Sequence, residues 1–162
     1  MVLAGVAMFA AGAAPGHELK AGPLVIVHTW VRATPPGATA TAAYGKITNL
    51  GTVADRLIGA SLSGARGAEF RSTTVRAGIV NIHQPSDGIP IPAGDTVELR
   101  PGDLSIMFSG LTSPLEHDTY VDGTLTFERA GKIAVEFFVE PRDTTGPAHN
   151  VDAHHHERGA PP

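Results

Sequence analysis

The sequence contains no cysteine, which excludes disulfides, thiolate zinc sites and iron–sulfur clusters. Any bound metal must therefore be held by histidine, methionine, carboxylate or backbone groups. Charged residues are also few, at 17% of the chain, and the net charge is −4 with no basic stripe. We therefore expect no binding to nucleic acid.

Long apolar runs are missing as well. Residues 1–14 are apolar and small, but this run is too short to span a bilayer as a helix. It resembles the apolar part of a secretory signal without the usual positive residues in front of it. Cleavage after Gly16 would leave His17 as the mature N-terminus, and cleavage after Ala13 is the alternative. We therefore expect residues 1–16 to be a signal peptide, a periplasmic location, and no membrane span in the mature chain.

Glycine and proline, in contrast, are abundant, with 19 and 13 of the 162 residues. They separate short β-branched and aromatic segments that are typical of strands. About nine strands are expected, at residues 24–32, 42–48, 56–62, 69–75, 79–83, 96–100, 104–108, 124–127 and 133–139. With no long helix predicted, the pattern favours an all-β, antiparallel Greek-key β-sandwich or barrel. The pattern stops at Pro141, so we expect one domain over residues 17–140 and a disordered tail over residues 141–162.

Several short segments follow one another in a specific order along this domain. They are Trp30–Gly37, Ala43–Tyr44, Ile47–Gly51, Asp55–Ala60, Ile91–Gly94, Val97–Leu99, Pro101–Gly102, Gly110–Leu111, Pro114–Leu115, Leu125–Glu128 and Ala130–Gly131. Their order and spacing resemble the periplasmic copper chaperones of the PCu(A)C family over about residues 23–140. The resemblance implies a cupredoxin-like sandwich and a role in delivering copper, typically toward respiratory oxidases.

The usual copper site of that family is only partly present. The family has a His, a Met about eleven positions later, and then a His-x-Met. The resemblance places the first His at Ser72, or at Arg71 if the register slips, and the first Met at His83. The His-x-Met falls on residues 105–107, of which only Met107 is retained. A hydroxyl is a poor copper ligand, so this divergent branch is not expected to hold Cu(I) tightly in the usual way.

A different site is expected in its place. Copper(II) prefers nitrogen ligands in a tetragonal plane, and a mature N-terminal His17 offers two, its α-amine and its ring Nδ1. One more imidazole would complete a histidine brace, as in some methanotroph relatives that this chain resembles. His83 and His28 are equal candidates for that imidazole, and His117 ranks behind them. Met107 could contact copper or simply pack in the core.

The tail adds a further group of possible metal ligands. Short tracts rich in histidine can capture metals, and this tail contains His149, His154, His155 and His156. The tail could collect Cu(II) weakly and pass it to the domain. We therefore expect a periplasmic copper carrier that binds one copper ion, with Cu(II) favoured over Cu(I). Its recipient would be a copper enzyme such as a respiratory oxidase or methane monooxygenase.

Two other functions are compatible with the sequence. Loss of the usual ligands would also produce a metal-free interaction module with a decayed copper site. A histidine brace also supports oxidative chemistry in copper enzymes, but the few aromatic residues do not indicate a substrate platform. Nucleophile elbows, P-loops and paired-carboxylate motifs are also missing from the sequence. A binding protein is therefore preferred to an enzyme.

Overall fold

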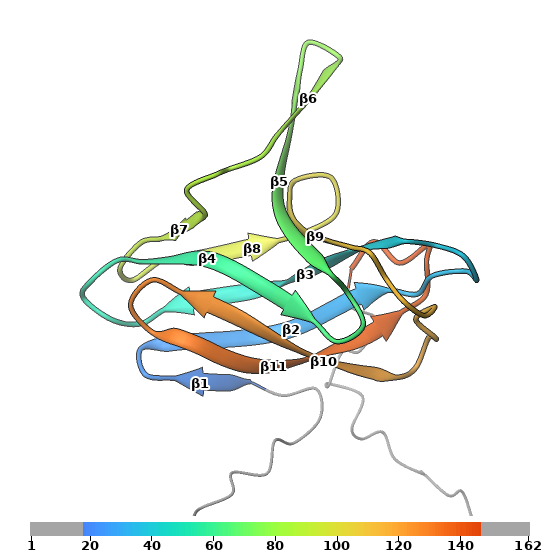
Figure 1. Cartoon of the computed structure of the whole chain (residues 1–162). Helices are drawn as coiled ribbons and strands as arrows, with labels where there is room; N and C mark the ends of the chain where they lie inside the picture. Colours follow the sequence, from blue (N-terminus) through green and yellow to red (C-terminus); the bar gives the residue numbers. More distant parts are fainter. Residues whose placement is uncertain (1–17, 147–162) are drawn as a thin grey trace, which may run out of the picture.

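The computed structural model describes residues 18–146, which form eleven strands (Figure 1). The strands are β1 (Leu19–Ala21), β2 (Leu24–Arg32), β3 (Ala40–Asn49), β4 (Asp55–Leu62), β5 (Gly67–Arg76), β6 (Ile79–His83), β7 (Ile89–Ile91), β8 (Thr96–Leu99), β9 (Leu104–Ser109), β10 (Tyr120–Phe127) and β11 (Gly131–Glu140). Within this range the chain forms no helix at all, and hence none of the length and apolarity needed to cross a bilayer.

The strands join into one continuous sheet in the order β6–β5–β9–β3–β2–β11–β10–β4–β7. Strand β1 pairs with β2, and β8 pairs with β3. All of these pairings are antiparallel except that of β2 with β11, which run parallel and bring the first and last long strands together. The sheet does not close, because β6 and β7 remain at its two ends. The prediction of an all-β, cupredoxin-like sandwich is thus confirmed.

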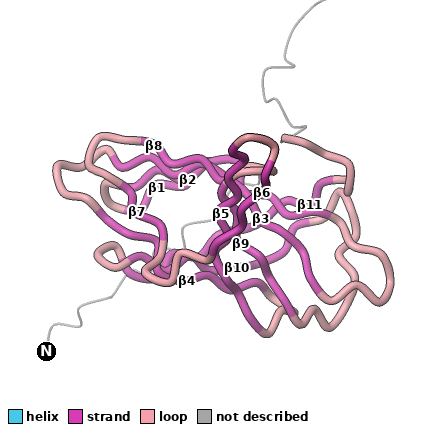
Figure 2. Tube along the Cα trace, turned by 90° about the horizontal axis from the view of Figure 1, so that it is seen from above, coloured by secondary structure: helices cyan, strands magenta, loops and turns pink. Residues whose placement is uncertain are grey.

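The sheet folds over a single core. Alternating side chains of β2, β3, β9, β10 and β11 point inward and are almost fully buried. Phe108 on β9 meets Phe137 on β11 edge to face, with ring centroids 5.8 Å apart. Because β3 and β2 lie between these strands in the sheet, the contact crosses the sandwich. Loops gather at the two ends of the elongated body (Figure 2).

Two strands were not expected from the sequence. Strand β1 is only three residues long and is joined to β2 by a tight turn at Gly22 and Pro23. Strand β7 has the sequence Ile89-Pro90-Ile91, and proline in so short a run indicates a loop. Both form because a long neighbouring strand, β2 or β4, offers them an edge.

The hairpin of β5 and β6 projects from the body of the sandwich (Figure 1). Its turn consists of Ala77 and Gly78, which both have positive φ, 50° and 78°, as a two-residue type I′ turn requires. Strand β5 pairs with β9 only as far as Ser72 opposite Leu104. Beyond Ser72, the N–H of Thr73 still donates to the carbonyl of Asp103 at 2.9 Å. Farther out, the described part of the chain pairs β5 only with β6.

Candidate functional site

His28 occupies an irregular position on β2. The register between β2 and β3 shifts between Val27 and Trp30, so His28 and Thr29 together lie opposite Gly45. His28 has a φ of 53°, a left-handed conformation that few residues other than glycine adopt. Such β-bulges are frequent next to functional sites, where they change the direction of a side chain. Here the bulge presents the His28 side chain to solvent.

Glycine is required at position 45, opposite this bulge. Gly45 has a φ of 156°, and a Cβ atom there would lie 3.4 Å from the Cα of Thr29 and 3.5 Å from the carbonyl oxygen of His28. These are ordinary contact distances, so the cost of a side chain at position 45 comes from the φ, which residues with a Cβ rarely adopt.

His28 also lies in a gap along one edge of β2. Strand β1 pairs with residues 24–26 of β2, and β11 pairs with residues 30–32. Across the gap, the hydroxyl of Thr29 donates a hydrogen bond to the carbonyl of Glu136 at 2.6 Å. Residue 28 therefore lies two positions beyond the last pair of the β1–β2 ladder, Leu19 opposite Ile26. His17 itself lies outside the described residues.

The other described histidines lie elsewhere. His83 is exposed on β6, opposite Ser72. His117 is exposed in the loop between β9 and β10, with its Nδ1 3.0 Å from a carboxylate oxygen of Asp118. Within residues 18–146, no three His, Asp or Glu side chains are grouped closely enough to hold a metal. The structure therefore does not bring His28, His83 and His117 together, and His149 and His154–His156 lie outside the described range.

Cross-strand register divides the positions that the resemblance aligns with the usual ligands between the two faces of β5, β6 and β9. Arg71 lies opposite Ser105, and Glu69 lies opposite Met107. Residues that lie directly opposite each other in a sheet point to the same face, so these four side chains share a face. Ser72 lies one residue along, opposite both Leu104 and His83. His83 and Met107 therefore point to opposite faces.

An ion pair occupies the face that includes Ser105 and Met107. The guanidinium Nε of Arg71 donates to one oxygen of Glu69 at 2.7 Å, and the amide of Gln84 donates to the other oxygen at 2.8 Å. Both carboxylate oxygens thus have donors, and the guanidinium of Arg71 is paired with Glu69 on the face of Met107. The four family positions together supply one soft ligand, the thioether of Met107.

Comparisons with known proteins establish the family. A family model described as "Putative lipoprotein LpqE-like" matches residues 24–139. The chain belongs to the LpqE-like family. A protein from Leifsonia xyli subsp. xyli named "Putative lipoprotein Lxx21020" is 32% identical over 125 residues, which are 77% of this chain and 74% of that protein.

Solved structures show the same relationship for the fold. The copper-bound PCuAC domain from PmoF2 is similar with a TM-score of 0.67 and 27% identity, covering 77% of this chain and 98% of that domain. The Cu(I) form of DR1885 from Deinococcus radiodurans is similar with a TM-score of 0.59 and 27% identity, covering 81% and 85%. The resemblance to PCu(A)C proteins is thus confirmed, and the LpqE-like chain shares their fold.

A row of four aromatic residues runs across four neighbouring strands of this LpqE-like sheet, β10, β11, β2 and β3. Tyr120 on β10 lies opposite Phe138 on β11, Phe138 opposite Trp30 on β2, and Trp30 opposite Tyr44 on β3. The rings of Trp30 and Tyr44 are 4.4 Å apart and only 3% and 5% exposed, so they do not form an open platform. Burial raises the pKa of Tyr44, and the nearby guanidinium of Arg32 offsets part of this rise. Sequence reasoning missed the row because the two strand pairs that form it, β2–β3 and β10–β11, are far apart in the chain.

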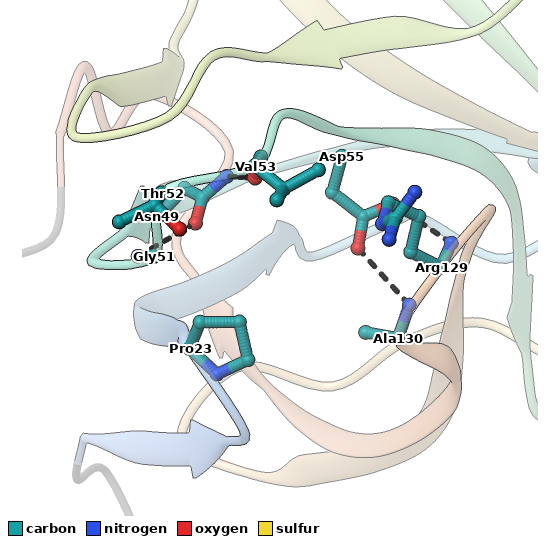
Figure 3. Close-up of a pocket in the computed structure, with 8 residues that line it drawn as sticks. All are labelled: Pro23, Asn49, Gly51, Thr52, Val53, Asp55, Arg129 and Ala130. Carbon is teal, nitrogen blue, oxygen red and sulfur yellow. Dashed lines mark hydrogen bonds between the residues drawn. The ribbon is translucent and has the colours of Figure 1, made fainter.

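An open pocket of about 430 Å³ lies beside the turn between β3 and β4 (Figure 3). Its two buried polar side chains, those of Asn49 and Asp55, form hydrogen bonds within the protein. The amide nitrogen of Asn49 donates to the carbonyls of Val53 and Ile91, at 2.9 and 3.2 Å. The Asn49 amide oxygen accepts from the N–H of Gly51 at 2.9 Å. Asn49 therefore holds the turn in shape rather than offering groups to a ligand.

Asp55 is the second buried polar side chain of this pocket. Its carboxylate accepts hydrogen bonds from the backbone N–H groups of Arg56, Arg129 and Ala130, at 2.7, 2.9 and 3.0 Å. Figure 3 shows the two bonds from Arg129 and Ala130. These bonds tie the start of β4 to the turn between β10 and β11. The Asn and Asp of the recognised sequence segments thus have structural roles, and the pocket is not a candidate binding site.

Proposed function

We propose that this chain is an extracytoplasmic copper carrier that binds one copper ion, delivers it to a copper enzyme and is not itself an enzyme. Support comes from the PmoF2 domain and DR1885, whose structures contain copper and which are 27% identical to this chain. The lipoprotein names of the LpqE-like family and of the Leifsonia relative support a location outside the cytoplasm. A respiratory oxidase or methane monooxygenase is the proposed kind of recipient.

We further propose that the ion is held by a histidine brace of His17 and His28. The observation on which this proposal rests is the position of His28, exposed on a bulge beside β1. In the β1–β2 ladder, Leu19 lies opposite Ile26 and Lys20 opposite Val25. The same register, continued two residues upstream, would lead residue 17 to His28. Cleavage after Gly16 would then supply the free amine that a brace requires.

The proposed ligands favour Cu(II) over Cu(I). An amine and two imidazoles are nitrogen donors of the kind that suit a tetragonal Cu(II) site. A Cu(I) site would need soft ligands, and Met107 is the one sulfur at the four family positions, on the same face as the Arg71 guanidinium. We propose the histidines at 149 and 154–156 as a weak secondary collector of Cu(II).

The test uses protein that has been secreted and processed by its own signal. N-terminal sequencing should find His17 first, and titration with Cu(II) should give one copper per chain with a tetragonal, nitrogen-rich EPR spectrum. His28→Ala should weaken binding by more than about tenfold, equivalent to about 1.4 kcal/mol. His83→Ala and His117→Ala are matched controls that should leave the spectrum unchanged. One extra residue before His17 should also weaken binding, because it removes the chelate formed by the amine and the ring.

Other outcomes would assign other functions. Equal Cu(II) binding by the wild type and the His28→Ala protein would reject the brace. A tight equimolar Cu(I) complex would reject the preference for Cu(II). Reductant-dependent oxidation of a substrate would identify an enzyme, and a processed chain that binds no copper would identify an interaction module.

A further inference from the structure

Strand β6 is an exposed edge at one end of the sheet. All five of its residues are exposed, and β5 is its one strand partner in the described part of the chain. The hairpin displays four large apolar side chains that are 59–64% exposed, those of Val75, Ile79, Val80 and Ile82. Proteins usually protect such an edge, because its free N–H and C=O groups can pair with another strand.

The opposite end of the sheet shows the protection that β6 lacks. Strand β7 is three residues long, its two isoleucines are buried, and its central residue is Pro90, which has no N–H to donate. Strand β6 contains no proline, no lysine and no carboxylate, and its pairing with β5 is free of bulges. One end of the sheet is thus blocked and the other is open.

The backbone of β6 is self-complementary. In a two-residue hairpin, the residues that flank the turn form a hydrogen-bonded pair, and such pairs then alternate along the ladder. Here Arg76 pairs with Ile79 next to the turn, so Ile79, Asn81 and His83 direct their backbone groups toward β5. The N–H and C=O groups of Val80 and Ile82 therefore point away from the hairpin.

We propose that β6 pairs with β6 of a second copy of this chain, antiparallel and with Asn81 on the two-fold axis. Val80 of each copy then lies opposite Ile82 of the other. Both residues have outward-pointing groups, so each pair exchanges two hydrogen bonds and no outward group is left over. The contact is isologous, and it closes at two copies because the β7 end offers no equivalent strand.

The side chains fit the same arrangement. Val75 lies opposite Val80 within the hairpin, on the face that also includes Ile82. When two copies pair, Val75, Val80 and Ile82 of one copy join the same three residues of the other in one apolar strip. The strip extends over β5 and β6 of both copies. The formal charges on residues 70–83 are those of Arg71 and Arg76, both on β5, so no like charges meet where the two copies pair. A second copy is therefore the occupant that fits this edge.

A charge-pairing experiment tests both the dimer and its register. Asn81→Lys or Asn81→Glu places like charges directly opposite each other across the axis, which destabilises a strand pair. Sedimentation velocity on the full chain should show concentration-dependent dimers for the wild type and a several-fold higher dissociation constant for each variant. An equimolar mixture of the two variants should dimerise again. Thr74→Lys and Thr74→Glu are matched controls, because Thr74 is the exposed β5 partner of Asn81 and lies one strand away from the contact.

Crosslinking gives an independent measure, because the chain has no cysteine of its own. Asn81 forms a non-hydrogen-bonded pair with its symmetry mate, with Cα atoms about 4.5 Å apart, within reach of a disulfide. Asn81→Cys should therefore form a disulfide-linked dimer with oxidised glutathione. Thr74→Cys should not, because three strand spacings place its mates about 14 Å apart.

Three outcomes would overturn the proposal. The first is a wild-type chain that remains monomeric at every concentration. The second is equal crosslinking at positions 74 and 81. The third is a monomer that binds vesicles of anionic phospholipid, with binding lost in Val80→Lys, since this would assign the apolar hairpin to a lipid surface. Unchanged thermal unfolding of the position 81 variants shows that a loss of dimers is not a loss of fold.

Discussion

His28 illustrates how much of this protein is decided at the scale of single residues. Sequence alternation alone could not say which way a strand histidine points, and His28 and His83 were equal candidates. The positive φ of His28 and its place beside β1 distinguish it from His83, which lies on a projecting hairpin. The two histidines thus differ in backbone conformation, which a residue name does not reveal.

Tyr44 gives a prediction at the same scale. Burial raises its pKa above the ordinary value of 10.0, because the phenolate is disfavoured away from water, and Arg32 lowers it in part. The unfolded chain therefore ionises Tyr44 at a lower pH than the folded chain. The resulting stabilisation is complete below the unfolded pKa and is lost as pH rises through the folded value. Urea unfolding between about pH 9 and pH 11 should show a steeper loss of stability for the wild type than for Tyr44→Phe. Equal slopes would contradict the prediction.

At the scale of elements, the bulge on β2 is the device that positions the candidate ligand. One extra residue on β2 opposes Gly45, whose φ of 156° is a backbone conformation that residues with a Cβ rarely adopt. Sequence reasoning located this strand correctly, but strand propensity does not indicate a bulge. A bulge depends on the register with the partner strand, which is set by the rest of the sheet.

Gly45→Ala should disturb this element in two measurable ways. A Cβ at the φ of Gly45 is strained, which should lower the free energy of unfolding by about 1–3 kcal/mol. A backbone shift that relieves this strain would move the bulge opposite Gly45, so it should redirect His28 and weaken Cu(II) binding, as followed by EPR titration. Gly102→Ala is the matched control, because Gly102 also has a positive φ, 80°, but no atom lies within 4 Å of the added Cβ. Both variants should lose stability, and Gly102→Ala should retain Cu(II) affinity.

At the scale of the whole molecule, stability rests on one core shared by both halves of the folded sheet. Strand β4 shows the contrast between its two faces, since Leu57 is 0% exposed and its neighbour Ile58 is 49% exposed. Leu57 belongs to the core cluster together with side chains of β2, β9 and β11. Truncation of Leu57 should therefore lower the free energy of unfolding strongly, and truncation of Ile58 only slightly.

Leu57→Ala should lower the free energy of unfolding by about 2–5 kcal/mol, because it removes buried methyl groups and leaves a cavity. Ile58→Ala removes similar atoms from an exposed position and should change it by about 0.5 kcal/mol or less. Chemical denaturation of the two variants beside the wild type measures both values. Similar losses in the two variants would contradict the placement of the core.

The sequence by itself determined the features that depend on local pattern. The glycine and proline breaks, together with β-branched runs, located nine of the eleven strands, and the ordered segments from Trp30 to Gly131 identified the family. The sequence also shows that three of the four positions that the resemblance aligns with copper ligands have other residues, because residue identity alone reveals this. These signals are short-range, and each can be read within a few residues.

Only the tertiary structure decided which distant residues meet. It paired β2 with β11, aligned the aromatic row, and placed Arg71 rather than Ser72 on the face of Ser105 and Met107. It also separated His83 from Met107 and, within residues 18–146, left β6 as a free edge. The physical reason is that strand register is fixed by packing across the whole sheet, and a shift of one residue moves every side chain to the other face. No local pattern contains that information.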